Sequence, residues 1–321
     1  MSNSVPLKRW PVVIGAILIQ LCLGAIYAWS VFTPALIAEG WSKLDTQFVF
    51  ATGLATFALV MVFAGRQLSA WGPRKLALIS GLMLGAGYIF AGLSGGTDFW
   101  AVCIGIGVIG GAGIGLGYVV PIAVGMRWFP DHKGLITGLA VAGFGFGAMG
   151  WVKIAGNWGD LIASLGIAQT FIIYGISFAI LVMLGSLWMS MPPAGWQPEG
   201  FEPPKATAGS GAENYTPTEM IYTPQFHLIF LTFVVSAGAG LMSIGLMKLY
   251  PMEALRFNGY SEMEASAIAG TAMAVFFSLA NGVGRIVWGM LSDKLGRKNS
   301  VVLMAFSQGI IWLAFSGMAG D

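Results

Sequence analysis

Arg285 has the clearest potential for chemistry in this sequence, because it is a charged residue inside an apolar stretch. It comes eight residues before Asp293, where the helix predicted over 264–291 gives way to charged residues. At 1.5 Å per helical residue, Arg285 lies about 12 Å inside a hydrocarbon layer about 30 Å thick. A charge at that depth costs at least about 2.5 kcal/mol, so an arginine there is expected to have a function. Its planar guanidinium can hold a carboxylate through two hydrogen bonds, which predicts a site for a small organic anion. The alternative is a side chain that only snorkels inward or caps a neighbouring carbonyl.

Residues of two other apolar stretches can complete such a site. Gln20, Gly24 and Tyr27 are spaced i, i+4 and i+7, so they share one face of a helix. Tyr118 lies in a separate apolar stretch. Tyrosine hydroxyls and a glutamine amide donate hydrogen bonds to a carboxylate, and aromatic rings exclude water from it. We therefore predict that Gln20, Tyr27 and Tyr118 bind substrate together with Arg285, although aromatic residues on such helices also serve packing and lipid contact.

A second pattern, G-x-G-x-x-G at Gly105, Gly107 and Gly110, matches the spacing of a dinucleotide-binding loop. Such a loop follows a β-strand and precedes an acidic residue about 20 positions later, whereas these glycines lie inside an apolar stretch. Gly107, Gly111 and Gly115 also repeat the small-xxx-small spacing that allows membrane helices to approach closely. The pattern therefore predicts helix packing, and no cofactor is expected.

The composition requires that much of this chain faces lipid. Of 321 residues, 56% are hydrophobic and only 9% are charged, whereas a soluble domain has about 25% charged residues. The net charge of +2 gives no reason to expect a nucleic-acid partner. Cys22 and Cys103 are isolated within apolar runs, and the two histidines lie in or beside loops. We therefore expect no metal site and no enzyme or redox subunit.

Apolar runs of about 20 residues predict nine membrane-spanning helices. They are expected at 11–36, 47–68, 75–96, 99–126, 135–157, 165–190, 226–250, 264–291 and 299–319. A polar segment rich in proline and glycine separates the sixth helix from the seventh. The sequence therefore predicts an all-α membrane protein with a six-helix bundle at 1–190, a linker at 191–225 and three helices at 226–321.

Lysines and arginines of the short loops predict the orientation of the chain in the membrane. With the N-terminus inside, eleven fall on the inner side: Lys8, Arg9, Arg66, Arg74, Lys75, Arg127, Lys133, Lys205, Lys294, Arg297 and Lys298. Four fall on the outer side: Lys43, Lys153, Lys248 and Arg256. We therefore expect a cytoplasmic (inner) membrane location with the N-terminus and the linker in the cytoplasm. Lys153, near the outer interface, is expected to snorkel to the surface.

An internal repeat relates the two parts of the chain. The loop "GRQLSAWGPRK" at 65–75 follows the second predicted helix, and "GMLSDKLGRKN" at 289–299 follows the eighth, 224 residues later. Gly65, Gly72 and Arg74 in the first loop match glycines and a lysine in the second. A parallel repeat of six helices is a transporter architecture. It predicts two pseudo-symmetric six-helix halves, with nine of twelve expected helices present and the second half incomplete.

"GMLSDKLGRK" resembles the loop motif of the major facilitator superfamily. Three further stretches resemble the oxalate/formate antiporter family within it: "GAIYAWSVF", "GLGYVVPIAVGMRWFPDHKGLITG" and "NGVGRIVWGMLSDKLGR". The resemblance implies a major facilitator fold, with aromatic residues around a central cavity and Arg285 holding the substrate carboxylate. It also implies a cytoplasmic gating loop with Asp293, Arg297, Lys298 and Arg74. Ser69 stands where the first loop usually has an aspartate, which leaves Asp293 as the better gating residue.

The acidic residues bear on how transport is driven. All 14 aspartates and glutamates fall in loops or at predicted helix ends, whereas a proton-coupled carrier usually keeps a titratable carboxylate within the membrane. We therefore predict an antiporter that exchanges small carboxylates such as oxalate and formate, acting in the lipid bilayer as a monomer. The alternative is a proton-coupled uptake carrier for a monocarboxylate such as lactate or pyruvate.

Overall fold

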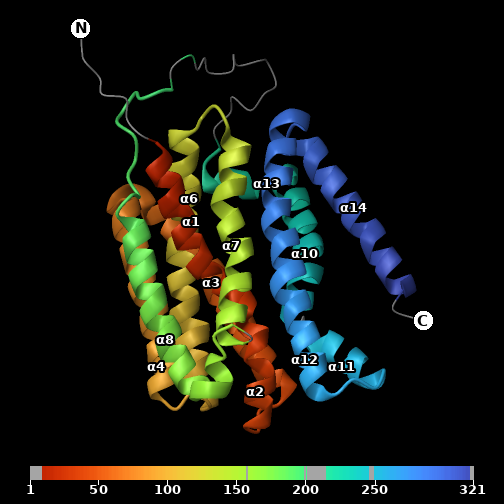
Figure 1. The fold of residues 1–321 in the computed structure, drawn as a ribbon. Helices are drawn as coiled ribbons and strands as arrows, with labels where there is room; N and C mark the ends of the chain where they lie inside the picture. The colour runs from red at the N-terminus through yellow and green to blue at the C-terminus, as the bar shows by residue number, and fades with distance from the viewer. Residues whose placement is uncertain (1–8, 157, 199, 201–214, 246–248, 319–321) are drawn as a thin grey trace.

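The computed structural model describes residues 9–156, 158–198, 200, 215–245 and 249–318. Throughout these ranges the regular elements are helices, and the axes of most of the long helices are roughly aligned with one another (Figure 1). This arrangement confirms the predicted all-α architecture.

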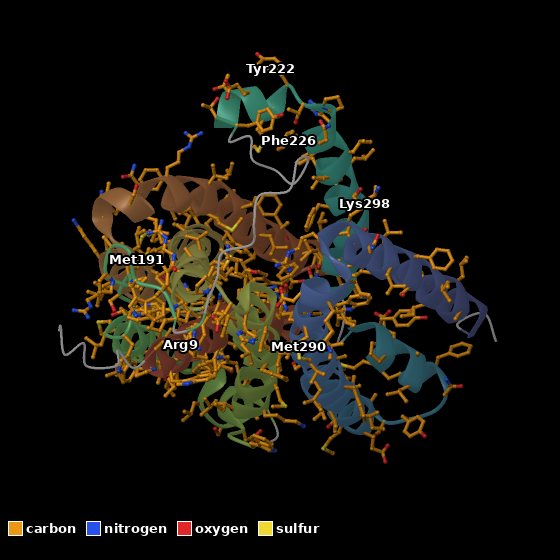
Figure 2. All side chains as sticks on the ribbon, turned by 90° about the horizontal axis from the view of Figure 1, so that it is seen from above. Arg9, Met191, Tyr222, Phe226, Met290 and Lys298 are labelled. Atoms are coloured by element: carbon orange, nitrogen blue, oxygen red, sulfur yellow. The ribbon has the colours of Figure 1, made fainter. Side chains whose placement is uncertain are left out.

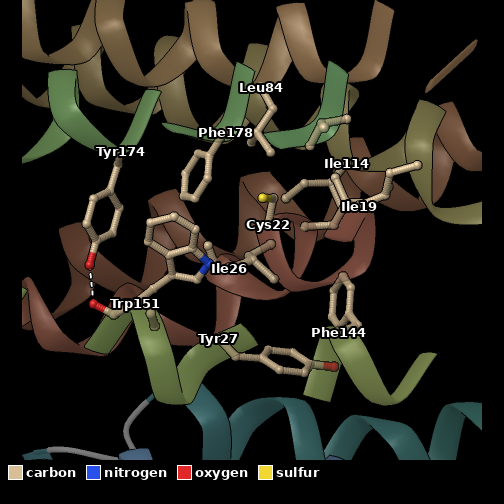
Figure 3. Packing of buried hydrophobic residues seen from close by; sticks show 14 of the residues in the cluster. Ile19, Cys22, Ile26, Tyr27, Leu84, Ile114, Phe144, Trp151, Tyr174 and Phe178 are labelled. Atoms are coloured by element: carbon tan, nitrogen blue, oxygen red, sulfur yellow. Dashed lines mark hydrogen bonds between the residues drawn. The ribbon is translucent and has the colours of Figure 1, made fainter. Parts of the chain in front are cut away.

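Six long helical segments form the N-terminal bundle. Their elements are α1 (Trp10–Leu23), the 3₁₀ segment η1 (Gly24–Val31), α2 (Thr33–Ala38), α3 (Lys43–Trp71), α4 (Pro73–Leu93), α5 (Phe99–Val102), the π-helical segment η2 (Cys103–Gly110), α6 (Gly111–Trp128), α7 (Lys133–Ala155) and α8 (Leu161–Ser186). The buried aromatic side chains of this bundle pack edge to face, and the hydroxyl of Tyr174 donates to the carbonyl of Trp151 (Figure 3). The core therefore fixes the faces that α7 and α8 present to one another.

The remaining helices lie to one side of this bundle, with α13 packed on α7 and α14 beyond α13 (Figure 1). They are α9 (Pro217–Ile221), α10 (Pro224–Gly245), α11 (Leu249–Phe257), α12 (Glu262–Thr271), the π-helical segment η3 (Ala272–Phe277), α13 (Ser278–Leu295) and α14 (Arg297–Met318). We refer to α10–α14 as the C-terminal helices. The predicted linker at 191–225 contains the short helix α9, which begins at a capping box of Thr216 and Glu219, and its residues 201–214 lie outside the described ranges.

Seven helices of the described chain are long and apolar enough to cross a membrane. They coincide with the first six predicted spans and with the eighth, which runs from Glu262 to Leu295. The other two predicted positions hold α10, whose apolar part covers Pro224–Gly238, and α14. The predicted positions are thus helical, and seven of the nine meet these criteria for a span.

The repeated loops adopt the same backbone geometry. Gly72, which joins α3 to α4, and Gly296, which joins α13 to α14, both have φ 78° and ψ 158°. This positive φ is readily available only to glycine. Their equal conformation at equivalent positions supports the repeat that the sequence predicts.

The glycines of the G-x-G-x-x-G stretch serve close packing, as predicted. A Cβ on Gly105 would lie 2.6 Å from the carbonyl oxygen of Gly87 on α4. A Cβ on Gly111 would lie 2.7 Å from the carbonyl oxygen of Gly53 on α3. Larger residues at these positions would push η2 and α6 away from both neighbouring helices.

The N-terminal bundle meets the C-terminal helices mainly where α7 packs on α13. A Cβ on Gly138 would lie 2.6 Å from the carbonyl oxygen of Arg285, and one on Gly145 would lie 2.6 Å from Oδ1 of Asn281. The backbones therefore touch at the level of Arg285, which places this arginine at the seam between the two groups of helices.

Candidate functional site

Arg285 lies on α13 and turns its guanidinium toward the N-terminal bundle. Its Nε donates to Oδ1 of Asn281, one helical turn earlier, at 2.8 Å. Its Nη2 lies 3.5 Å from the hydroxyl oxygen of Tyr27 on η1, at the outer limit of a hydrogen bond. Both partners are neutral, so within the described chain the guanidinium has no carboxylate to neutralise it. It therefore keeps donors available for an anion.

Aromatic rings surround this guanidinium, with Phe144 at their centre. The guanidinium carbon of Arg285 lies 5.7 Å from the Phe144 ring centre, within the range of a cation–π contact. Tyr27 meets the Phe144 ring edge to face at 5.0 Å (Figure 3), and Tyr118 does so at 5.2 Å. Phe57 stacks on Phe144 at 6.2 Å and meets Tyr118 at 5.2 Å. These rings reduce the access of water, which strengthens any ionic contact that Arg285 makes.

Gln20 has a different neighbourhood from the one predicted. Its side chain is fully buried, and its Nε2 donates to the backbone carbonyl of Tyr118 at 3.3 Å, whereas its Oε1 has no partner within the described structure. The contact ties α1 to α6. The structure thus brings Arg285, Tyr27 and Tyr118 around Phe144 and places Gln20 behind them. Direct binding of substrate by Gln20 stays a prediction.

A cavity of about 610 Å³ connects this group of residues to the end of the helices nearest the linker. Arg285 and Tyr118 line its inner part, and Lys133, Arg297 and Ser300 line its outer part. Its size falls within the range of small-molecule sites, about 300–1,000 Å³. The positive groups along it favour the entry of an anion from that end.

Asp293 joins the C-terminal helices to the start of α7. Its two carboxylate oxygens each accept a hydrogen bond at 3.0 Å, from the backbone N–H groups of Gly134 and Leu135. The first N–H groups of a helix have no partner within the helix and favour a negative charge. Arg297 donates to the same carboxylate at 3.1 Å. This arrangement is what a latch between the two groups of helices requires.

The other two predicted gating residues make no such link in the described structure. Arg74 donates to the carbonyl of Leu187 at 2.7 Å, at the end of α8, so its contact lies within the N-terminal bundle. Lys298 is exposed on α14 (Figure 2), and it forms no ion pair with a described side chain. Their part in gating stays a prediction.

The sequence interpretation missed Phe144 and Asn281 and misplaced Lys153. Asn281 lies four residues before Arg285, a spacing that brings two side chains together on a helix and could have identified it. Lys153 was expected to snorkel, but that prediction is wrong. Its side chain is only 7% exposed, and its Nζ donates to Oγ1 of Thr271 at 3.3 Å, because this face of α7 turns toward α12 rather than outward.

A polar cluster fixes the loop between α6 and α7. Arg9 donates to both carboxylate oxygens of Asp131, at 3.1 and 3.2 Å, and Nδ1 of His132 lies 3.0 Å from one of them. Partial burial acts to raise the pKa of Asp131, but the hydrogen bonds from His132 and Arg9 outweigh it and hold the pKa below its ordinary value. Asp131 is therefore a carboxylate over the whole physiological pH range.

Comparison with known proteins agrees with this architecture. Residues 12–321 match the model of the Major Facilitator Superfamily. The chain is 30% identical to an uncharacterized MFS-type transporter of Escherichia coli, YhjX, over 90% of this chain and 67% of that protein. It is 24% identical to the oxalate:formate antiporter of Oxalobacter formigenes over 97% of this chain and 70% of that protein.

A third relative, the apicoplast pyruvate carrier 1 of Toxoplasma gondii, is 25% identical over 44% of this chain and 34% of its own length. Three findings indicate one class of protein: the seven helices of the described chain that can cross a membrane, the repeated loop, and the match to the family model along nearly the whole chain. The chain belongs to the major facilitator superfamily and is a multi-pass membrane transporter.

Proposed function

We propose that the protein exchanges small carboxylates, of the oxalate and formate kind, across the cytoplasmic membrane by alternating access. The observation that carries this proposal is the guanidinium of Arg285, which lies at the seam between the two groups of helices with only neutral partners in the described chain. In the proposed orientation, the N-terminus and the linker lie in the cytoplasm. The cavity then leads from the cytoplasmic side to Arg285.

A carboxylate is the ligand whose chemistry fits this site. Its two oxygens match the two parallel N–H donors of a guanidinium, and the Tyr27 hydroxyl can donate a further hydrogen bond to one of them. Arg285 is partly buried, and a charge removed from water without a counter-charge is costly. Binding an anion would remove that cost, which favours reorientation of the loaded carrier over the empty one. This preference is the physical basis for exchange rather than net transport.

The substrate would also contact both groups of helices. Tyr27 lies on η1 in the N-terminal bundle and Arg285 on α13, so an anion held by both draws the two together. The close approach of α7 and α13 at their glycines provides a surface about which they can rock. Asp293 would hold α7 against α13 beside the cytoplasmic end of the cavity, and its bonds to α7 would have to break for that end to open further. A single copy of the chain would carry out transport.

The second candidate is a proton-coupled monocarboxylate carrier. It is favoured by the similarity to the pyruvate carrier and by a 24% identity to human monocarboxylate transporter 14 over 57% of this chain. Both candidates use Arg285 for the carboxylate, and they differ in what drives uptake.

Counterflow in liposomes that contain the full-length protein distinguishes the two. Vesicles loaded with unlabelled oxalate or formate, and empty vesicles, are presented with labelled oxalate at equal pH on both sides. The proposal predicts rapid uptake only into loaded vesicles. Uptake of labelled lactate or pyruvate into empty vesicles under an imposed proton gradient, without oxalate counterflow, would replace it with the second candidate.

A further inference from the structure

Lys153 is a buried cation to which the proposed site gives no role. It lies on α7 with only 7% of its side chain exposed. Its ammonium donates to the hydroxyl of Thr271 on α12 at 3.3 Å. It forms no ion pair with any acidic side chain of the described chain. The buried ammonium of Lys153 is therefore paired with a neutral hydroxyl, although an anion would stabilise its charge more strongly.

The position of Lys153 at the end of α7 explains only part of its burial. A lysine in the last turn of a helix interacts favourably with the free carbonyl groups there, and Lys153 occupies such a position. That interaction is equally available to a side chain that reaches water. It gives no reason for the ammonium to cross to α12 and lose its hydration, which is costly for a compact and strongly hydrated charge.

Lys153 lies on the opposite side of Arg285 from the cavity. It follows Phe144 by nine residues on α7, a distance of about 13 Å along the helix. The cavity lining runs from Arg285 toward Lys133 and Arg297, and it includes neither Lys153 nor Thr271. The two cations therefore follow one another along the seam between the two groups of helices, with Lys153 nearer the end away from the linker.

We propose that Lys153 is a second carboxylate-binding group, which receives the anion from the outer side before it reaches Arg285. This inference rests on the proposed function. When the seam opens at the end away from the linker, the contact of Lys153 with Thr271 breaks and the ammonium becomes accessible. A carboxylate then replaces the hydroxyl and forms a stronger, charge-assisted bond. When the seam closes, Thr271 again satisfies the ammonium and the anion passes to Arg285.

Lys43 provides a matched comparison at the same end of the molecule. Its side chain is 59% exposed, and it pairs with Glu253 on α11. An exposed cation with an acidic partner has its charge satisfied and screened by water. Replacing it removes the same charge from the same end of the protein, at an exposed contact between α3 and α11 instead of a buried one.

The test measures exchange of labelled oxalate by the full-length protein from each side of the membrane. Right-side-out and inside-out vesicles are prepared from cells with the wild type, Lys153→Gln, Lys153→Arg and Lys43→Gln. For Lys153→Gln we expect the KM for external oxalate to rise about tenfold, as expected for loss of one charge-assisted contact, with the internal KM unchanged. Lys153→Arg keeps most of the external affinity, and Lys43→Gln leaves both KM values unchanged.

A second measurement changes the charge after the protein has folded in the membrane. Lys153→Cys is treated from outside with an aminoethyl or a sulfonatoethyl methanethiosulfonate, which attach a positive or a negative group. We expect the positive group to restore the external KM and the negative group to raise it further. The wild type treated in the same way is the control, because Cys22 and Cys103 are buried.

The outcomes separate this inference from the proposed function. Equal changes of KM on both sides, or equal effects of the two reagents, would overturn the role of Lys153 and leave carboxylate exchange intact. A wild type that shows no counterflow of oxalate or formate would overturn the proposed function, and the inference with it.

Discussion

Replacing Asp293 with asparagine tests the proposed latch at the cytoplasmic end. The change keeps the size of the side chain but removes the negative charge that accepts hydrogen bonds from Gly134 and Leu135. Hydrogen bonds to a charged group contribute about 1.5–3 kcal/mol each when fully protected. The Asp293 side chain is 31% exposed, and asparagine can still accept one of the two bonds, so we expect a loss of about 1–2 kcal/mol. This loss lowers the population of the latched state about 5- to 30-fold.

The assay measures access to the cavity from the cytoplasmic side. A cysteine replaces Thr137, which lines the cavity next to α13, and its rate of reaction with a membrane-impermeant thiol reagent is followed in inside-out vesicles. We expect the reaction to be several-fold faster with Asp293→Asn than with aspartate at 293. Lys294→Gln is the matched control, because Lys294 is exposed on the same helical turn. Equal reaction rates for Asp293→Asn and its parent would refute the latch.

Two further predictions concern the seam and the α6–α7 loop. For Gly138→Val we expect a destabilisation of about 1–3 kcal/mol, because the Cβ of the valine would lie 2.6 Å from the carbonyl oxygen of Arg285. The measurement is the Tm in detergent, which should fall. An unchanged Tm would contradict the close packing of α7 on α13. Because the pKa of Asp131 is lowered in the folded protein, its bonds to Arg9 and His132 stabilise the fold at pH values above the ordinary aspartate pKa, about 3.9. This contribution to stability is lost as the pH falls through the lowered pKa. Asp131→Asn should therefore lower the Tm at pH 7 and reduce its dependence on pH below about 4; a wild-type dependence in the variant would exclude this source.

Helix positions and the basic loops were predictable because they depend on local sequence. Runs of apolar residues fix the spans, and glycines at 72 and 296 are needed for the positive φ of the repeated loops. The depth of Arg285 follows from its distance to Asp293 along one helix. Each of these inferences uses only residues that are close in the chain.

The neighbours of the site residues were less predictable, for a physical reason. A helix that is hydrophobic on all sides has no polar face to show which side turns toward another helix. The sequence pattern therefore does not indicate that Phe144 lies beside Arg285 or that Gln20 bonds to the backbone of α6. It also does not indicate that Lys153 faces α12. These contacts depend on how α1, α7 and α13 are rotated against each other.

The most direct test of the central claim is the affinity for oxalate when Arg285 is changed. Counterflow by the full-length protein is compared for the wild type, Arg285→Lys, Arg285→Gln and the control Lys294→Gln. The account predicts that Arg285→Gln abolishes exchange, and that Arg285→Lys keeps the charge but loses the two parallel donors, raising the KM about tenfold or more. All three variants should be present in the membrane at the wild-type level. Exchange by Arg285→Gln with an unchanged KM would contradict the account and place the anion elsewhere.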